Sequence, residues 1–192
     1  MDEKDLPIYM QDWSHATRVG AGPKAETYRI SDNKVAKFKS LRSLGFNHIR
    51  TGSSVVEELL KESEDAKLMH NARIPVLQPD GVFRIPLKTI WHPETMKHIS
   101  PFWQKYFPKI FGQTYFPGIV MEYVPGILLE SVPLDIQQGL HMRAAAEILR
   151  ATRMPNFSLE RNPDYNVAAN TLWNPKTDEI YFIGEPWNPR KS

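Results

Sequence analysis

Residues 16–38, ATRVGAGPKAETYRISDNKVAKF, decide the fold of the N-terminal half of the chain. Two extended pieces lie on either side of Gly20 and Gly22, where glycine allows a tight turn. The triplet SDN at 31–33 is a second turn, and KVAKF at 34–38 is a short apolar strand. This order predicts three consecutive strands of an antiparallel sheet.

The rest of the chain alternates between helical and extended patterns, which predicts an α+β fold. The C-terminal part, 125–192, is expected to fold as one unit with the N-terminal part, 1–124. The predicted elements are a helix at 53–70, a strand–PDG turn–strand unit at 74–87, a buried strand at 118–124, an amphipathic helix at 134–153 and a hairpin at 171–183.

Composition narrows the class of protein. The chain has 192 residues, a formal net charge of +2 and no cysteine, so disulfides, thiolate metal sites and a cysteine nucleophile are excluded. Its charge is too small to indicate a nucleic-acid-binding protein. Neither a signal peptide nor an apolar run of membrane-spanning length is visible, and we expect a cytoplasmic location without membrane binding. Its histidines show no metal-binding spacing, so no metal ligands are predicted.

Residues 88–116 form an aromatic-rich insertion in the N-terminal part. They hold eight of the 21 aromatic residues, together with four lysines and a single acidic residue, Glu94. Stacking on single-stranded nucleic acid is one use of such a segment, but core packing and covering of a cleft are commoner. We therefore expect the insertion to contact a small hydrophobic molecule or a protein partner.

Two glycines, a lysine and two acidic residues follow one another along the first part of the chain. Gly20 and Gly22 would allow the backbone to approach a ligand closely. Lys37 lies on the strand after them. The helix at 53–70 carries the acidic residues Glu58 and Glu62, one turn apart.

Together with the strand that ends in EYVPG at 122–126 and the loop asparagine Asn170, this set resembles the protein-kinase-like superfamily. Within it, the chain is most similar to the aminoglycoside-phosphotransferase and small atypical kinase branch, over about residues 16–187. The resemblance implies a kinase-like fold with an antiparallel-sheet N-lobe, an acidic helix and a short, truncated helical C-lobe that ends in a β-hairpin. It also implies that the backbone of Glu122 and Tyr123 meets an adenine, and that Asn170 binds a metal. Gly20 and Gly22 would then belong to a loop that covers phosphates, and Lys37 would neutralise those phosphates. Glu62 is the best match to the helix acid that pairs with this lysine, and Glu58 is a rival one turn earlier.

The chain departs from this pattern where the family performs chemistry. Tyr165 stands five residues before Asn170, where the family has the aspartate that accepts a proton, and Asp164 is displaced by one position. Gly184 replaces the family's metal-binding aspartate, and Glu185 follows it on a strand whose neighbours point to opposite faces. A general base contributes roughly 10²–10⁴-fold to a rate. Ordinary phosphoryl transfer is therefore not expected.

Three functions fit these features. The first is a pseudokinase whose interlobe cleft or aromatic insertion binds a ligand or partner, with no cofactor beyond a vestigial ATP/Mg²⁺ site. The second is an enzyme of the cyclase or isomerase type that folds a hydrophobic molecule in an apolar cleft and uses Asp164, Tyr165 or Glu185 for proton transfer. The third is a residual phosphotransferase that uses Asp164, Asn170 and Glu185 in shifted positions. A homodimer over exposed apolar surface is a further hypothesis.

Overall fold

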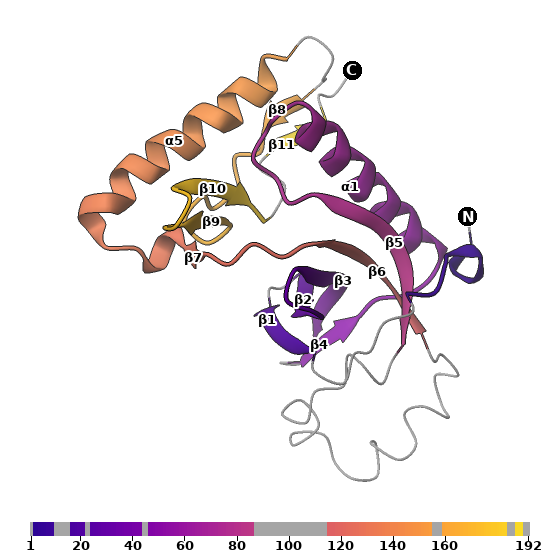
Figure 1. The fold of residues 1–192 in the computed structure, drawn as a ribbon. Coiled ribbons are helices and arrows are strands. Elements are labelled where there is room, and N and C mark those ends of the chain that lie inside the picture. Colours follow the sequence, from indigo (N-terminus) through magenta and orange to yellow (C-terminus); the bar gives the residue numbers. More distant parts are fainter. Residues whose placement is uncertain are drawn as a thin grey trace. The chain divides into compact units, whose positions relative to one another are not determined.

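The computed structural model describes residues 2–9, 16–21, 24–43, 46–86, 115–154, 159–183 and 187–189. Within these ranges the chain is a mixed α+β protein, and Figure 1 labels its elements. It divides into two compact units, one formed by residues 1–65 and 79–123 and the other by residues 66–78 and 124–192. None of the described helices is both long and apolar enough to span a bilayer.

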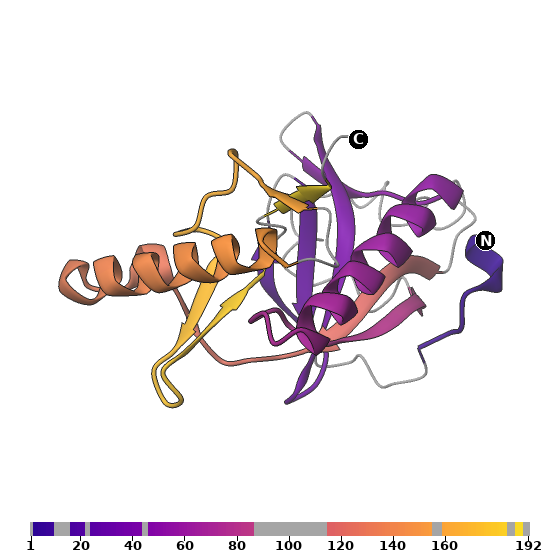
Figure 2. The same ribbon diagram turned by 90° about the horizontal axis from the view of Figure 1, so that it is seen from above.

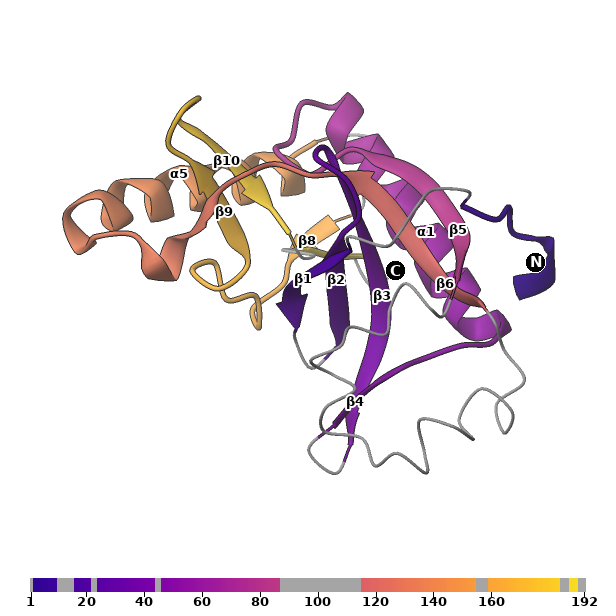
Figure 3. The same ribbon diagram turned by 60° about the horizontal axis from the view of Figure 1, so that its bottom comes forward.

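The first unit is built on an antiparallel sheet of six strands, seen in Figure 3. Five of them lie in the order β1-β2-β3-β6-β5, and β4 pairs with β3 beside this path. The unit also holds the short 3-10 helix η1 (Glu3–Asp5) and the first turns of α1 (Ser53–Asn71). Its strands are β1 (Thr17–Ala21), β2 (Ala25–Arg29), β3 (Lys34–Ser43), β4 (Phe46–Ile49), β5 (Pro79–Pro86) and β6 (Tyr115–Glu122).

Apolar side chains cover both faces of this sheet. On one face, α1 packs through Val55, Val56 and Leu59 against Val82 of β5 and Ile119 of β6, and Figure 2 shows α1 lying across the sheet. On the other face lies a second buried cluster, which comprises Tyr28, Ile30, Ala36, Phe38, Ile85, Phe116 and Val120. The alternation of side chains along each strand therefore separates an α1-facing surface from an aromatic surface.

Gly118 of β6 lies on the aromatic surface and is required there by close packing. A Cβ atom at this position would come within 2.9 Å of the Phe38 ring and 2.8 Å of the Ile85 Cδ1 atom. The side chains of β3 and β5 thus occupy the space that any larger residue would need.

The second unit combines a helix with two small sheets. Its strands form a three-stranded sheet in the order β10-β9-β7 and a separate pair, β8 with β11. The elements are β7 (Ile127–Leu128), the 3-10 helix η2 (Leu129–Ser131), α5 (Leu134–Thr152), β8 (Leu159–Arg161), β9 (Thr171–Asn174), β10 (Glu179–Phe182) and β11 (Trp187–Pro189). Strands β9 and β10 form the predicted hairpin, so that expectation is confirmed.

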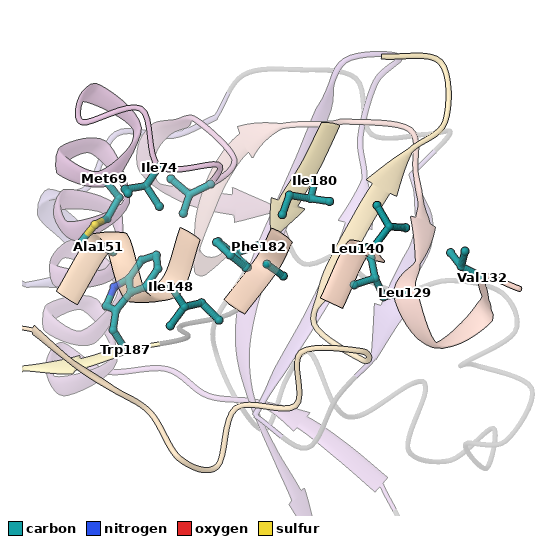
Figure 4. Packing of buried hydrophobic residues seen from close by; sticks show 12 residues of the cluster. Met69, Ile74, Leu129, Val132, Leu140, Ile148, Ala151, Ile180, Phe182 and Trp187 are labelled. Atoms are coloured by element: carbon teal, nitrogen blue, oxygen red, sulfur yellow. The ribbon is translucent and has the colours of Figure 1, made fainter. Parts of the chain in front are cut away.

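The core of the second unit lies between α5, the hairpin and the chain around the end of α1. Leu140 and Ile148 of α5 point toward Ile180 and Phe182 of β10, and Met69 of α1 joins the same cluster (Figure 4). The apolar spacing that predicts α5 therefore marks the residues of that helix that face this core, to which α1 contributes Met69 near its end.

One predicted unit is wrong. The sequence predicts a strand, a PDG turn and a second strand at 74–87, but the PDG residues begin the single strand β5. Gly81 has a φ of 153°, and the pairing of β5 with β6 is irregular between Pro79 and Gly81. The glycine lets the strand absorb an extra residue as a bulge, so that the chain continues instead of reversing.

Candidate functional site

The central strands of the first unit align several predicted site residues in one row. Gly20 of β1 lies opposite Thr27 of β2, Thr27 lies opposite Lys37 of β3, and Lys37 lies opposite Ile119 of β6. Directly opposed residues of antiparallel strands share a face, and Ile119 packs on α1. Lys37 therefore extends from the sheet surface that faces α1, with Thr27 and the small residue Gly20 beside it.

Two lysines of β3 converge on one carboxylate of α1. The Nζ atom of Lys37 donates a hydrogen bond to Oε1 of Glu62. The Nζ atom of Lys39 lies 2.6 Å from Oε2 of the same side chain. Lys37 and Lys39 are two residues apart on a strand, so both point to the α1-facing surface. We call these three residues the two-lysine cluster.

The two-lysine cluster is largely shielded from water and carries a net positive charge. The side chains of Lys37, Lys39 and Glu62 are only 14%, 19% and 10% exposed. Burial by itself raises the pKa of Glu62, but the charges and hydrogen bonds of both lysines outweigh it and hold that pKa below its usual range. With Glu62 ionised and both lysines protonated, the cluster has one excess positive charge.

Stability alone does not account for this arrangement. Replacing a buried ion pair by well-packed apolar residues is often neutral or stabilising, because desolvation offsets the Coulomb attraction. The shielded charges on this sheet surface therefore make the cluster a candidate functional site. The second lysine strengthens this inference, since a single lysine already neutralises the carboxylate.

Glu58 has a different partner. It receives hydrogen bonds from Arg50, with an Nη2–Oε1 distance of 3.2 Å, and both side chains are well exposed. The pairing that the resemblance predicts, between Lys37 and Glu62, is present, and Glu58 is not the partner of Lys37.

The two residues predicted to meet an adenine lie at the end of β6. Glu122 is the last residue of β6 and lies opposite Lys34 of β3. The backbone N–H of Tyr123 donates to the carbonyl of Asn33 at 2.8 Å, and the Arg29 guanidinium lies 4.5 Å from the centre of the Tyr123 ring. One backbone donor of this segment is therefore already paired within the first unit.

In the second unit, the loop at 162–170 is closed by its own hydrogen bonds. The Tyr165 hydroxyl donates to the carbonyl of Asn170 at 2.6 Å, and its ring meets Phe182 edge-to-face. Burial raises the pKa of Tyr165 far above its ordinary value. The side-chain amide of Asn170 donates to the carbonyl of Asn166 at 3.0 Å. Tyr165 thus anchors the loop, and its hydroxyl is poorly suited to proton transfer.

The other predicted catalytic residues are less constrained or lie elsewhere. Asp164 is exposed, and its backbone N–H donates to the Asn162 side chain at 3.0 Å. Gly22, Glu185 and nearly all of the aromatic insertion at 88–116 lie outside the described residues. Across the ranges that the structure describes, no three histidine, aspartate or glutamate side chains gather as a metal site.

Lys39 is the functional candidate that the sequence reasoning missed. Lys39 follows Lys37 by two residues, so a strand that continues past Phe38 places both side chains on the same face. The predicted strand ends at Phe38, one residue before Lys39, whereas β3 continues to Ser43.

Comparisons with protein-family models, with curated proteins and with solved structures find no significant match to this chain. The kinase-like resemblance is thus neither supported nor contradicted by relatives.

Proposed function

We propose that this chain is a degenerate kinase-like protein that binds a phosphate-bearing small molecule through Lys37 and Lys39, and that it does not carry out ordinary phosphoryl transfer. The observation that carries the proposal is the sharing of one Glu62 carboxylate by two lysines. The excess positive charge of this cluster suits an anion.

The chemistry of lysine makes phosphate the favoured ligand class. The ammonium group is a compact charge with three donors, and it binds phosphate as a point charge. Ammonium groups that are held in place and largely shielded from water interact more strongly with an anion than free surface lysines do. Glu62 fixes both ammonium groups, so the site loses little side-chain entropy when a ligand arrives.

The row formed by Gly20, Thr27 and Lys37 supports the same ligand class. Glycine leaves the backbone accessible, and the threonine hydroxyl can donate a hydrogen bond to a phosphate oxygen. In protein kinases, a strand lysine paired with a helix glutamate contacts the nucleotide phosphates. The pairing of Lys37 with Glu62 is the same combination of residue types.

The loop at 162–170 supports the second part of the proposal, that the chain does not carry out ordinary phosphoryl transfer. Tyr165 takes the place of the family's proton acceptor, and its hydroxyl is engaged with Asn170. Loss of a general base alone lowers a rate by roughly 10²–10⁴-fold. Within the described residues, nothing favours the cyclase or isomerase hypothesis over ligand binding, since nearly all of its main support, the aromatic insertion, falls outside them.

Thermal unfolding of the chain with inorganic phosphate, pyrophosphate and ATP tests this proposal. A ligand at about 100 times its Kd stabilises a protein by about 2.7 kcal/mol. For a chain of this size that shift in free energy raises Tm by roughly 5–10 °C.

We expect pyrophosphate or ATP to raise Tm with or without Mg²⁺, and transfer of the γ-phosphate to remain at background in a radiolabel assay. If none of the three anions raises Tm, the binding site is wrongly assigned. A rise that depends on Mg²⁺ and comes with phosphate transfer would instead support the residual phosphotransferase.

A further inference from the structure

The face of α5 opposite the core carries apolar and small residues in contact with solvent. The inner face buries Leu140, Ala144, Ile148 and Ala151. Figure 4 labels three of them, Leu140, Ile148 and Ala151. At about 100° per residue, the opposite face presents Gly139, Met142, Ala146 and Leu149. Met142 is 69% exposed and Leu149 is 48% exposed. We call these four residues the outer stripe.

Packing within the described part of the chain does not explain Gly139. It lies within an exposed stretch of α5, and a Cβ atom placed on it would meet no atom within 4 Å. Glycine is the least favourable helix residue after proline, so this position weakens the helix without an internal packing reason. A helix glycine is useful where another backbone or a large side chain must approach closely.

The outer stripe is complementary to its own reversed copy. Gly139 and Leu149 lie five residues before and after position 144, and Met142 and Ala146 lie two residues before and after it. In an antiparallel pair of identical helices centred on position 144, each large residue would therefore face a small one. Such alternation of large and small residues is what lets two helices interlock.

Charges at the two ends of α5 follow the same symmetry. Asp135 and Arg153 lie nine residues before and after position 144, both are exposed, and both fall on the same side of the helix as the outer stripe. In the antiparallel arrangement, Asp135 of one chain would face Arg153 of the other at both ends. Opposite charges at the rim set the register and direction of helix pairing.

We propose that the outer stripe is a self-association surface, on which α5 pairs antiparallel with α5 of a second copy about a twofold axis at the level of position 144. An isologous contact of this kind uses the same surface patch on both subunits. It needs no residue of the two-lysine cluster and is independent of the ligand proposed above.

The size of the surface sets the expected affinity. The 19 residues of α5 span about 28 Å at the usual helical rise. A contact between two single helices of this length is smaller than the standard protein interface and belongs with weak, reversible complexes. We expect a monomer–dimer equilibrium with a Kd on the order of micromolar.

Sedimentation equilibrium of the full chain, at concentrations on both sides of that range, measures this Kd. Gly139→Gln inserts a bulky, neutral helix former into the contact, so it is expected to raise Tm of the monomer while weakening dimerisation by at least about tenfold. Ile136→Gln is the matched control, because Ile136 is exposed on the same helix but lies off the outer stripe. This control is expected to leave Kd unchanged.

A charge exchange tests the antiparallel register. Asp135→Arg and Arg153→Asp are each expected to raise Kd by about two- to fivefold, and the double variant is expected to restore it. Circular dichroism checks that the helix is intact in each variant. The proposal is overturned by a wild-type chain that stays monomeric at all concentrations, by an unchanged Kd in Gly139→Gln, or by a double variant that dimerises no better than the single ones.

Discussion

Removing the carboxylate of Glu62 is the sharpest perturbation of the two-lysine cluster. Glu62→Gln keeps the size of the side chain but leaves Lys37 and Lys39 without a counter-charge. The neutral amide can still accept one hydrogen bond, so the substitution removes charge rather than packing. The two ammonium groups then repel each other in a position that is mostly shielded from solvent.

The loss of stability in Glu62→Gln follows from the burial of the two lysines that lose their counter-charge. Deleting one partner of a buried ion pair destabilises a protein by about 3–5 kcal/mol, because an uncompensated charge remains. Lys37 and Lys39 keep 14% and 19% exposure, so some water still reaches them and the lower end of this range applies. We expect a loss of about 3 kcal/mol in the free energy of unfolding for Glu62→Gln.

Urea denaturation followed by tryptophan fluorescence measures the loss, and Glu58→Gln is the matched control. Glu58 lies one turn earlier on α1, but its ion pair with Arg50 is 39% and 44% exposed. Exposed pairs contribute about 0–1 kcal/mol, so the control should lose less than about 1 kcal/mol. Equal losses in the two variants would refute the reasoning from burial.

The same comparison has a defined pH dependence. The folded-state pKa of Glu62 lies below its ordinary value of 4.5, so its ionised form stabilises the folded state above that pH. This contribution is lost as pH falls through the folded-state pKa. The difference between wild type and Glu62→Gln should therefore be largest near neutral pH and shrink below pH 4.5. A difference that grows on acidification would contradict the assigned charge state.

Two further predictions concern packing and the loop. Gly118→Ala should lower the free energy of unfolding, measured in urea, by about 1–3 kcal/mol, since its methyl group would meet the Phe38 ring and Ile85 at less than 3 Å. An unchanged urea midpoint would show that these two side chains move aside at little cost. Tyr165→Phe should lower the free energy of unfolding by about 1 kcal/mol through loss of the hydrogen bond to Asn170 and leave ligand affinity unchanged. A loss of affinity for the phosphate-bearing ligand in this variant would instead indicate that Tyr165 belongs to the binding site.

The sequence predicts the helices well because their burial follows a simple period. The helix predicted at 53–70 is observed at Ser53–Asn71, and that predicted at 134–153 is observed at Leu134–Thr152. Each helix buries one apolar stripe, so its apolar residues recur in the sequence with the 3.6-residue period of a helix. The turns of the first three strands are equally local, since glycine and the SDN triplet favour them by conformation alone.

Features that depend on distant partners were not predictable in the same way. The PDG residues have the composition of a turn, and pairing with β6 converts them into a bulge at the start of β5. The short pair β8–β11 joins segments that are far apart in sequence. The hydrogen bond from the Tyr165 hydroxyl to Asn170 spans only five residues, but it depends on the irregular fold of the loop between them, which no sequence pattern predicts.

Calorimetric titration of the chain with ATP in the absence of Mg²⁺ tests the central claim most directly. Lys37→Met and Lys39→Met each remove one charge from the cluster and retain its apolar stem, whereas Lys34→Met removes a lysine of the same strand that pairs with Asp80 at 2.7 Å. Lys34 is an odd number of residues from both, so it points to the other face. We predict that each cluster variant weakens ATP binding by at least about tenfold, because it loses one charge-assisted hydrogen bond to the ligand. Lys34→Met is predicted to bind ATP like wild type. Equal affinities in all four proteins, or a loss confined to Lys34→Met, would contradict the assignment.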